Sequence, residues 1–279
     1  MNTTALGRSA DGTIDARAGS TVLPEQLENV VIGTISVIAF LLLWEFSIVL
    51  GWLNPLFTSS PRRIVLMAIE LFEGDAIYQD LAVSGVEFLV GYLLAVVVGI
   101  PLGMLMGWYR RLNAALEPFV SALYATPRIA LLPLIVIWLG IGQGSKMAII
   151  LLGAIFPILV NTITGVRTVD RDFVRVARSF CANDWQLFRT VVLPSSVPLI
   201  LTGLRLGLGH ALVGIVVGEL YAATAGIGFM IAVAGSSFQT DKVMVGILII
   251  STAGMVMTQL LRVVERRFER WRIATRTTT

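Results

Sequence analysis

Residues 168–194 read TVDRDFVRVARSFCANDWQLFRTVVLP, a polar stretch between two long apolar runs of the chain. Within it, Phe173, Ala177 and Phe180 recur at the spacing that places side chains on one face of a helix. Charged residues fill the other faces, so the segment is predicted to lie outside the bilayer. A helix of this kind has one apolar side, which needs a partner or must fold back on the chain's own membrane domain.

The second half of the stretch predicts a turn and another short helix. Asn183 or Asp184 is the expected N-cap, because a side-chain oxygen there accepts a hydrogen bond from a free backbone N–H group. Leu187 continues the apolar pattern, and Pro194 ends the unit because proline has no N–H to donate. The whole stretch is therefore predicted to be a helix–turn–helix loop.

The composition is that of a membrane protein. Hydrophobic residues make up 56% of the 279 residues and charged residues only 14%, unlike the balance of a soluble globular protein. A single Cys and a single His exclude a disulfide framework and a Cys/His metal site within the chain. The net charge of +3 does not indicate nucleic-acid binding, since the basic residues stand at the ends of apolar runs.

Six apolar runs of roughly 20 residues follow the first polar segment, and each is long enough to cross about 30 Å of hydrocarbon. Their approximate bounds are 29–51, 86–108, 118–140, 146–166, 197–221 and 243–263. Pro127 and Pro133 predict kinks in the third run. The predicted fold class is all-α, a polytopic membrane protein with about six transmembrane helices.

The polar segments predict the domain division and the orientation. We expect a disordered cytoplasmic tail over 1–28, a transmembrane domain over 29–265 and a basic cytoplasmic tail over 266–279. With the N-terminus inside, most arginines between spans, including those of 168–194, lie on the cytoplasmic side. The other side holds only Arg62, Arg63, Lys146 and Lys242. Both termini are therefore predicted to be cytoplasmic.

Glycines repeat at short helical spacing inside two of the spans. They are Gly99, Gly103, Gly107, Gly203, Gly207, Gly214 and Gly218. Glycine lets membrane helices approach closely, which is how helices pack when the surrounding lipid is as apolar as their side chains. Two interpretations stay open. These faces pack helices within one subunit, or one of them meets a second transmembrane subunit and lines a path.

Several ionisable side chains fall inside the predicted spans, where such groups normally face protein or water. They are Glu45, Arg128, Arg205, His210 and Glu219, of which the last four are candidates for a solute pathway. Arg205, His210 and Glu219 do not share one stripe of their helix, which argues against a proton relay. The two arginines can favour an anion, or each can pair with a helix end or a neighbouring carboxylate.

No signature of catalysis is present. The stretch LGIGQGSK at 139–146 resembles a phosphate-binding loop but lacks the adjacent Gly-Lys-Ser/Thr that such a loop needs. One His cannot form HExxH, and the sequence contains no GxSxG. The chain is therefore predicted to have no catalytic residue, no metal site and no bound cofactor. Any energy for transport comes from a partner or from an ion gradient.

The loop at 168–194 resembles the cytoplasmic "EAA" loop of permease subunits of binding-protein-dependent ABC importers. That loop reads Glu-Ala-Ala, then Gly, then Ile-x-Leu-Pro at fixed spacing, where this chain has Arg-Val-Ala at 175–177, Cys181 and Val-Val-Leu-Pro at 191–194. Other stretches resemble the same family, notably LLLWEF, SSPRRI, GIPLGMLMG, ATPRIALLPLIVIWLGIG, GAIFPILVNTITG, LTGLRLGLGHA and VGELYAATAGIGFMI. Together they resemble the nitrate, sulfonate and taurine branch.

This resemblance implies a type I importer permease fold in a bacterial inner membrane. It also implies a homodimer, two copies of a separate ATPase that binds the ATP and Mg, and an extracytoplasmic solute-binding protein. The implied solute is a small organic or inorganic anion such as a sulfonate, nitrate or taurine. The residues that it implies for coupling to the ATPase are Arg171, Phe173, Arg175, Ala177, Arg178, Phe180, Cys181, Asp184, Leu187, Leu193 and Pro194.

Two positions depart from the family's loop. An acidic residue is usual where Arg175 stands, and a glycine is usual where Cys181 stands. Glycine reaches positive φ without steric cost, whereas a cysteine does not. We therefore expect the loop to turn differently at Cys181, and Arg175 to face an acidic partner surface in place of a basic one.

Two other classes of protein remain as alternatives. An ion-coupled secondary transporter acting alone would show internal repeats and carboxylates near the midplane of the membrane, and neither is evident in the sequence. A membrane assembly protein without a transport role would use the loop and the basic tail as its interaction surface. Co-purification with an ATPase separates the importer from both alternatives.

Overall fold

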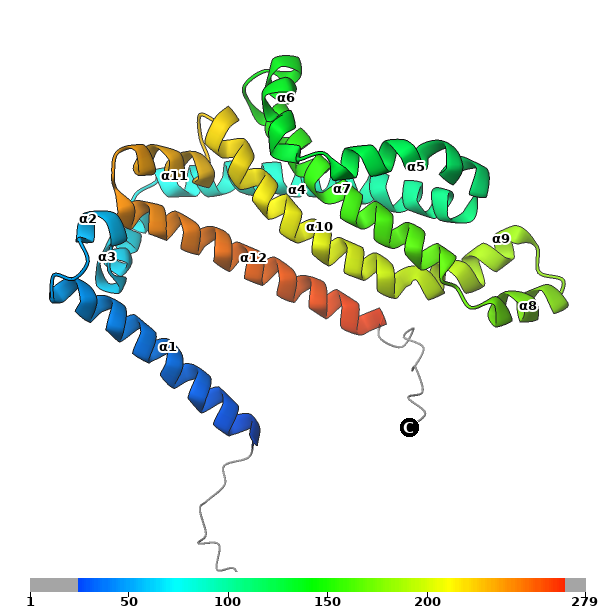
Figure 1. The fold of residues 1–279 in the computed structure, drawn as a ribbon, viewed down its shortest axis with the longest axis horizontal. Helices are drawn as coiled ribbons and strands as arrows, with labels where there is room; N and C mark the ends of the chain where they lie inside the picture. The colour runs from blue at the N-terminus through cyan, green and yellow to red at the C-terminus, as the bar shows by residue number, and fades with distance from the viewer. Residues whose placement is uncertain (1–24, 269–279) are drawn as a thin grey trace, which may run out of the picture.

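The computed structural model describes residues 25–268, which form helices joined by short connections (Figure 1). The helices are α1 Glu25–Val49, α2 Pro55–Thr58, α3 Pro61–Glu73, α4 Ala76–Trp108, α5 Arg110–Ala125, η1 Arg128–Leu131, α6 Leu132–Leu139, α7 Gln143–Arg167, α8 Arg171–Ser179, α9 Asp184–Leu187, η2 Phe188–Val192, α10 Leu193–Ala222, α11 Ile227–Ser236 and α12 Thr240–Phe268. Helix α1 thus begins inside the predicted tail over 1–28, and α12 runs into the predicted tail over 266–279. The remaining parts of both tails lie outside the described residues.

Five helices in the described range are long and apolar enough to cross a membrane, and a broken helix pair makes up to six. The all-α prediction with about six spans is therefore confirmed. The third predicted span, 118–140, is the broken one, because α5 and the η1–α6 segment meet at 93°. This is a break and not the predicted kinks. Pro127 disfavours helical backbone at the preceding residue, and Thr126 accordingly adopts φ −72° and ψ 129° and ends α5.

Helix α7 lies at the centre of the packing, between α4 and α10 (Figure 1). The two neighbours come so close that only glycine fits at the contact. A Cβ atom added at Gly103 of α4 would lie 2.7 Å from the Cβ of Thr162. One added at Gly207 of α10 would lie 3.0 Å from the carbonyl oxygen of Ala154. The backbones of three helices are thus in near contact, as expected for packing without a hydrophobic driving force.

All seven glycines that the sequence singled out for packing face α7. At each of them the nearest atom to an added Cβ belongs to that helix, and they are Gly99, Gly103 and Gly107 on α4 and Gly203, Gly207, Gly214 and Gly218 on α10. In the described chain these glycines pack helices within one subunit. Gly91 of α4, which the sequence analysis passed over, approaches Ile150 in the same way.

Capping and ion pairing tie the connection after α1 to the rest of the molecule. Ser60 caps α3 by accepting a hydrogen bond from the backbone N–H of Arg63. Glu45 of α1 accepts one from the backbone N–H of Arg62 at 3.1 Å. This intramembrane carboxylate therefore stabilises the N-terminus of α3, where a negative charge is favourable. The Arg63 side chain pairs with Asp241 of α12 at 2.7 Å.

Helices α8 and α9 form a hairpin beyond the adjoining ends of α7 and α10 (Figure 1). At the end of α8, the N–H of Cys181 donates to the Arg178 carbonyl at 2.9 Å and the N–H of Ala182 donates to the Ala177 carbonyl at 3.1 Å. This pair of bonds is the Schellman arrangement, which needs a left-handed residue. Cys181 supplies it with φ +57°. The loop thus keeps the left-handed conformation that suits a glycine, and our expectation of a different turn is wrong.

The start of α9 is capped in both directions. The side chain of Asn183 accepts a hydrogen bond from the Gln186 N–H at 2.8 Å, and the side chain of Gln186 accepts one from the Asn183 N–H at 2.9 Å. Of the two predicted caps, Asn183 is the one that the structure uses, while Asp184 is the first helical residue. A reciprocal capping box of this kind satisfies two free backbone N–H groups where α9 begins.

The close approach of α10 to α7 predicts a difference between two neighbouring glycines. We expect Gly207→Ala to lower the free energy of unfolding by about 1–3 kcal/mol, because the added methyl group overpacks against α7. Gly209→Ala is the matched control on the same helix, since its added Cβ has no atom within 4 Å. It should leave stability unchanged or raise it. Thermal unfolding in detergent measures both, and equal effects would contradict the packing argument.

The left-handed backbone at Cys181 predicts that glycine is better there. We expect Cys181→Gly to stabilise the end of α8 by about 1 kcal/mol, because glycine adopts positive φ without a steric penalty. Slower amide hydrogen exchange at residues 181 and 182 is the measurement. Ala177→Gly, within α8 itself, is the control and should speed exchange there. Faster exchange in Cys181→Gly would show that the cysteine side chain makes a contact that the loop needs.

Candidate functional site

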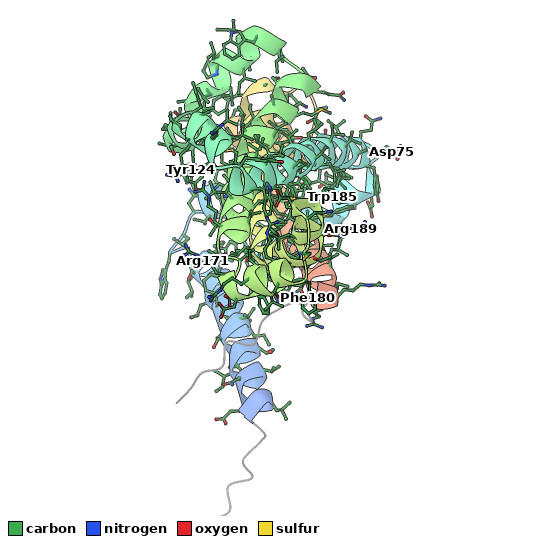
Figure 2. The ribbon with its side chains drawn as sticks, turned by 90° about the vertical axis from the view of Figure 1, so that its right-hand side faces the viewer. Asp75, Tyr124, Arg171, Phe180, Trp185 and Arg189 are labelled. Atoms are coloured by element: carbon green, nitrogen blue, oxygen red, sulfur yellow. The ribbon has the colours of Figure 1, made fainter. Side chains whose placement is uncertain are left out.

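The hairpin exposes aromatic and aliphatic side chains. Phe180 is 82% exposed and Trp185 is 68% exposed, and Phe173 and Val176 are also exposed. Figure 2 looks onto this end of the molecule and labels Phe180 and Trp185, with Arg189 close to Trp185. An apolar surface on a polar loop is the usual mark of a docking site for another protein.

The structure separates the predicted coupling residues by their exposure. Arg171, Phe173, Arg175, Arg178, Phe180, Cys181 and Asp184 are exposed, Ala177, Leu193 and Pro194 are half-buried, and Leu187 is buried. Leu187 is only 2% exposed, so it packs inside the chain and is not available to a partner in this conformation. Leu193 and Pro194 belong to the first turn of α10, where they join the hairpin to a membrane span.

Ion pairs within the hairpin occupy two of its arginines. Arg175 pairs with Asp172 on the same helix, and Arg178 pairs with Asp184 across the turn. Arg178 also donates to the carbonyl oxygen of Ala182 at 3.2 Å. Such exposed pairs contribute little to stability. The pair with Asp172 does, however, offset the positive charge that we expected Arg175 to present to an acidic partner surface.

Aromatic packing connects the hairpin to the end of α4. The ring of Phe188 lies 5.5 Å from that of Trp108 on α4 and 6.2 Å from that of Trp185. These rings help to line a pocket of about 300 Å³. The sequence analysis did not single out Trp108, Trp185 or Phe188 as site residues. The three-residue spacing of Trp185 and Phe188 was the available signal, because it places both rings on one side of a helix.

Two of the four candidate pathway residues have partners elsewhere in the chain. Arg205 of α10 forms an ion pair with Glu265 of α12. Glu219, 1% exposed, accepts hydrogen bonds from the Ser84 hydroxyl and the Gly228 N–H, both at 2.6 Å. These contacts hold α10 to α12, α4 and α11, which is the structural role that the sequence left open.

A buried charged network surrounds Glu219 at the ends of α4, α7 and α10. Lys146, which we placed on the non-cytoplasmic side at the start of the span 146–166, is 3% exposed and forms an ion pair with Glu87 of α4 at 2.5 Å. Asp80, also on α4, accepts a hydrogen bond from the Gly226 N–H at 2.7 Å. Sequence reasoning missed Glu87 because it looks like one charge at the edge of an apolar run. Its helical spacing from Asp80 was the available signal.

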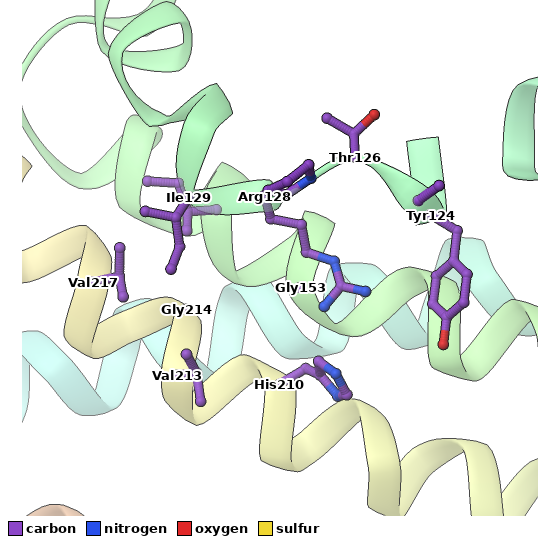
Figure 3. A pocket seen from close by; sticks show the side chains of 12 residues that line it. Tyr124, Thr126, Arg128, Ile129, Gly153, His210, Val213, Gly214 and Val217 are labelled. Carbon is purple, nitrogen blue, oxygen red and sulfur yellow. The ribbon is translucent and has the colours of Figure 1, made fainter. Parts of the chain in front are cut away.

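The other two candidates, Arg128 and His210, line one pocket (Figure 3). The pocket has a volume of about 340 Å³ and lies at the break between α5 and η1, against α7 and α10. The Arg128 guanidinium lies over the Tyr124 ring, with 5.6 Å from Cζ to the ring centroid. The break thus places a cation from one span next to an imidazole from another.

Comparison with known proteins identifies the family. The profile described as "Binding-protein-dependent transport system inner membrane component" matches residues 99–270. The chain is 35% identical to the taurine transport system permease protein TauC of Escherichia coli over 245 residues, which cover 86% of this chain and 88% of that one. It is also 35% identical over 230 residues to a Bacillus subtilis protein named as an aliphatic sulfonates transport permease, SsuC, which covers 82% of this chain and 83% of that one.

A relative with another named solute matches over a similar length. The formylaminopyrimidine transport permease protein ThiX of Halalkalibacterium halodurans is 32% identical over 240 residues, covering 86% of this chain and 95% of that one. Among solved structures, an inward-facing MetNI methionine ABC transporter matches 67% of this chain and 94% of its own, with a TM-score of 0.50 and 20% identity, which shows the fold alone. The chain belongs to the inner-membrane components of binding-protein-dependent transport systems, and it is a permease subunit of an ABC importer.

Proposed function

We propose that two copies of this chain form a homodimeric permease for a small sulfonate-like or taurine-like anion. Two copies of a separate ATPase bind ATP and Mg on the cytoplasmic side, and an extracytoplasmic solute-binding protein delivers the solute. The α8–α9 end of the molecule and both termini face the cytoplasm, as the concentration of arginine on that side indicates. The ATPase hydrolyses ATP, and this chain forms the path of the solute through the membrane.

The observation that carries the ATPase contact is the apolar surface of the hairpin. Phe180 and Trp185 are exposed, and Phe180 directly follows α8, a short and mostly polar helix. Burying two aromatic side chains against a partner stabilises a complex, and such anchors dominate the energy of many interfaces. The caps at Cys181 and Asn183 satisfy the backbone groups where α8 ends and α9 begins, which orders the turn between the two short helices.

The continuity of the helix that follows the hairpin supports a coupling role. One helical segment runs from Asp184 to Ala222 without a break, through the π-helical turn Phe188–Val192. A displacement of the hairpin by the ATPase would therefore move α10 as a unit. The glycines of α10 would carry that movement to α7, since the two backbones are in near contact. This is how closure of an ATPase dimer would be converted into a change of the path.

The names of two relatives support the choice of solute. TauC is named for taurine and SsuC for aliphatic sulfonates, and both are 35% identical to this chain. ThiX, named for a formylaminopyrimidine, is 32% identical, as is the SsuC protein of Escherichia coli, so two of the three named solute groups among these relatives are sulfonates. A sulfonate is also the solute that suits the cationic side chain of Arg128 in the membrane domain.

The docking surface predicts which variant releases the ATPase. We expect Phe180→Asp to weaken the complex by at least about 2 kcal/mol, a roughly 30-fold loss of affinity, because it places a charge at the centre of an apolar contact. The measurement is co-purification of a tagged chain with the ATPase encoded nearest to it, after extraction in mild detergent.

Phe238→Asp is the matched control for this test. Phe238 is also an exposed phenylalanine, but it lies between α11 and α12 at the opposite end of the molecule from the hairpin (Figure 1). This variant should retain the ATPase. If the wild-type chain retains no ATPase, the proposed partnership is wrong. If both variants retain it equally, the partnership stands but the ATPase docks elsewhere.

A further inference from the structure

Arg128 directs an unneutralised charge into the pocket at the break between α5 and η1. Within residues 25–268, this arginine forms no ion pair, and its buried Nε–H group has no hydrogen-bond acceptor. Figure 3 shows its side chain extending toward α7 and α10, with the Tyr124 ring on one side. A cation in a membrane span is costly unless an opposite charge or water accompanies it. Such a group is a candidate for function.

Other charged side chains in the spans have partners within the chain. Lys146 pairs with Glu87, and Arg205 pairs with Glu265. Glu219 accepts two hydrogen bonds from the chain. The pocket guanidinium is the exception among these groups, so its position is not explained by packing alone.

The rest of the pocket offers a second polar contact and an apolar wall. The Nδ1 atom of His210 is hydrogen-bonded to the Leu206 carbonyl at 2.9 Å, which leaves Nε2 available to the pocket. Ile129 and Val213 provide apolar surface on the same pocket. Its volume of about 340 Å³ lies at the small end of the roughly 300–1,000 Å³ that small-molecule sites span.

This combination suits a solute with one charged end and one apolar end. A guanidinium binds oxyanions through two parallel N–H groups, which gives both strength and orientation. The terminal Nη groups of Arg128, which Figure 3 shows directed into the pocket, are the donors that a solute can reach. A short aliphatic sulfonate carries three oxygens at one end and a hydrocarbon chain at the other. It therefore matches the arginine on one wall and Val213 on another.

We propose that this pocket is the place where the permease holds the oxyanion group of its solute during passage through the membrane. Arg128 donates two hydrogen bonds to the sulfonate, the imidazolium form of His210 donates one through its Nε2–H from the opposite side, and Tyr124 holds the guanidinium in place. The proposal rests on the proposed function, since it assigns the pocket to the solute that the permease carries. It adds the residues and the bonding pattern.

Binding to the purified permease–ATPase complex tests the site directly. The probe is ethanesulfonate, read as the rise in unfolding temperature with concentration, and ethyl methyl sulfone is its uncharged control. We expect the wild-type complex to be stabilised by ethanesulfonate and not by the sulfone or by equal ionic strength of sodium chloride. Arg128→Gln should weaken the apparent affinity for ethanesulfonate roughly ten- to hundredfold, the usual value of hydrogen bonds to a charged group. Arg128→Lys keeps the positive charge but loses the two parallel N–H donors. Its affinity for ethanesulfonate should therefore lie between those of the wild type and Arg128→Gln.

The double variant Arg205→Gln with Glu265→Gln is the matched control. It removes a guanidinium from the same membrane domain together with its partner carboxylate, so the net charge is unchanged. Its affinity for ethanesulfonate should equal that of the wild type. No stabilisation of the wild type, or equal stabilisation of the wild type and Arg128→Gln, overturns the site. A loss of the homodimer in Arg128→Gln also overturns it, because the arginine would then be pairing with a second copy.

Uptake into proteoliposomes that contain the complex and its binding protein separates this proposal from the proposed function. We expect Arg128→Gln to lower ethanesulfonate uptake at least about tenfold while ATP hydrolysis stimulated by the binding protein stays within about twofold. A misfolded variant would lose both activities together. If the wild type binds ethanesulfonate through Arg128 but does not import it, the site stands and the proposed solute is wrong.

Discussion

The close approach of α4 and α10 to α7 is the constraint on which the rest of the structure depends. At Gly103 and Gly207 a side chain as small as a methyl group would meet Thr162 or the backbone at Ala154. Lipid gives membrane helices no hydrophobic reason to associate, so close van der Waals contact must hold them together. The three helices therefore behave as one packed unit, to which the pocket, the buried charges and the hairpin are attached.

Burial in this unit requires that polar groups be satisfied by neighbouring helices. Lys146 of α7 and Glu87 of α4 neutralise each other, and Glu219 of α10 accepts hydrogen bonds that hold the start of α11. Removing one partner of such a pair leaves an uncompensated charge, which costs far more than the pair gains. The network thus specifies which helices meet at this end of the molecule. Arg128, at the break in the third predicted span, has no such partner within residues 25–268.

One continuous helix connects the two candidate sites. The segment Asp184–Ala222 begins in the hairpin, next to Trp185, and passes the pocket at His210. Because its backbone is in near contact with α7 at several glycines, a movement of this helix carries α7 with it. In our proposal, this helix transmits a displacement of the hairpin by the ATPase to the pocket. The pocket's other wall, at Arg128, belongs to a different span, so the same movement would change the distance between the two solute-binding side chains.

The sequence by itself determined the helical fold, the helical loop at 168–194 and the glycines at helical spacing inside the spans, and it narrowed the cap to Asn183 or Asp184. These features depend on local chemistry, because spacing, backbone freedom and capping act over a few residues. Only the tertiary structure decided which charges meet. Lys146 and Glu87 are far apart in sequence, and nothing local shows that they pair while Arg128 does not. The sequence predicted kinks in the third span, where the structure has a break at Thr126–Pro127. The 93° bend at this break forms a pocket, because it brings Arg128 over α7 and opposite His210.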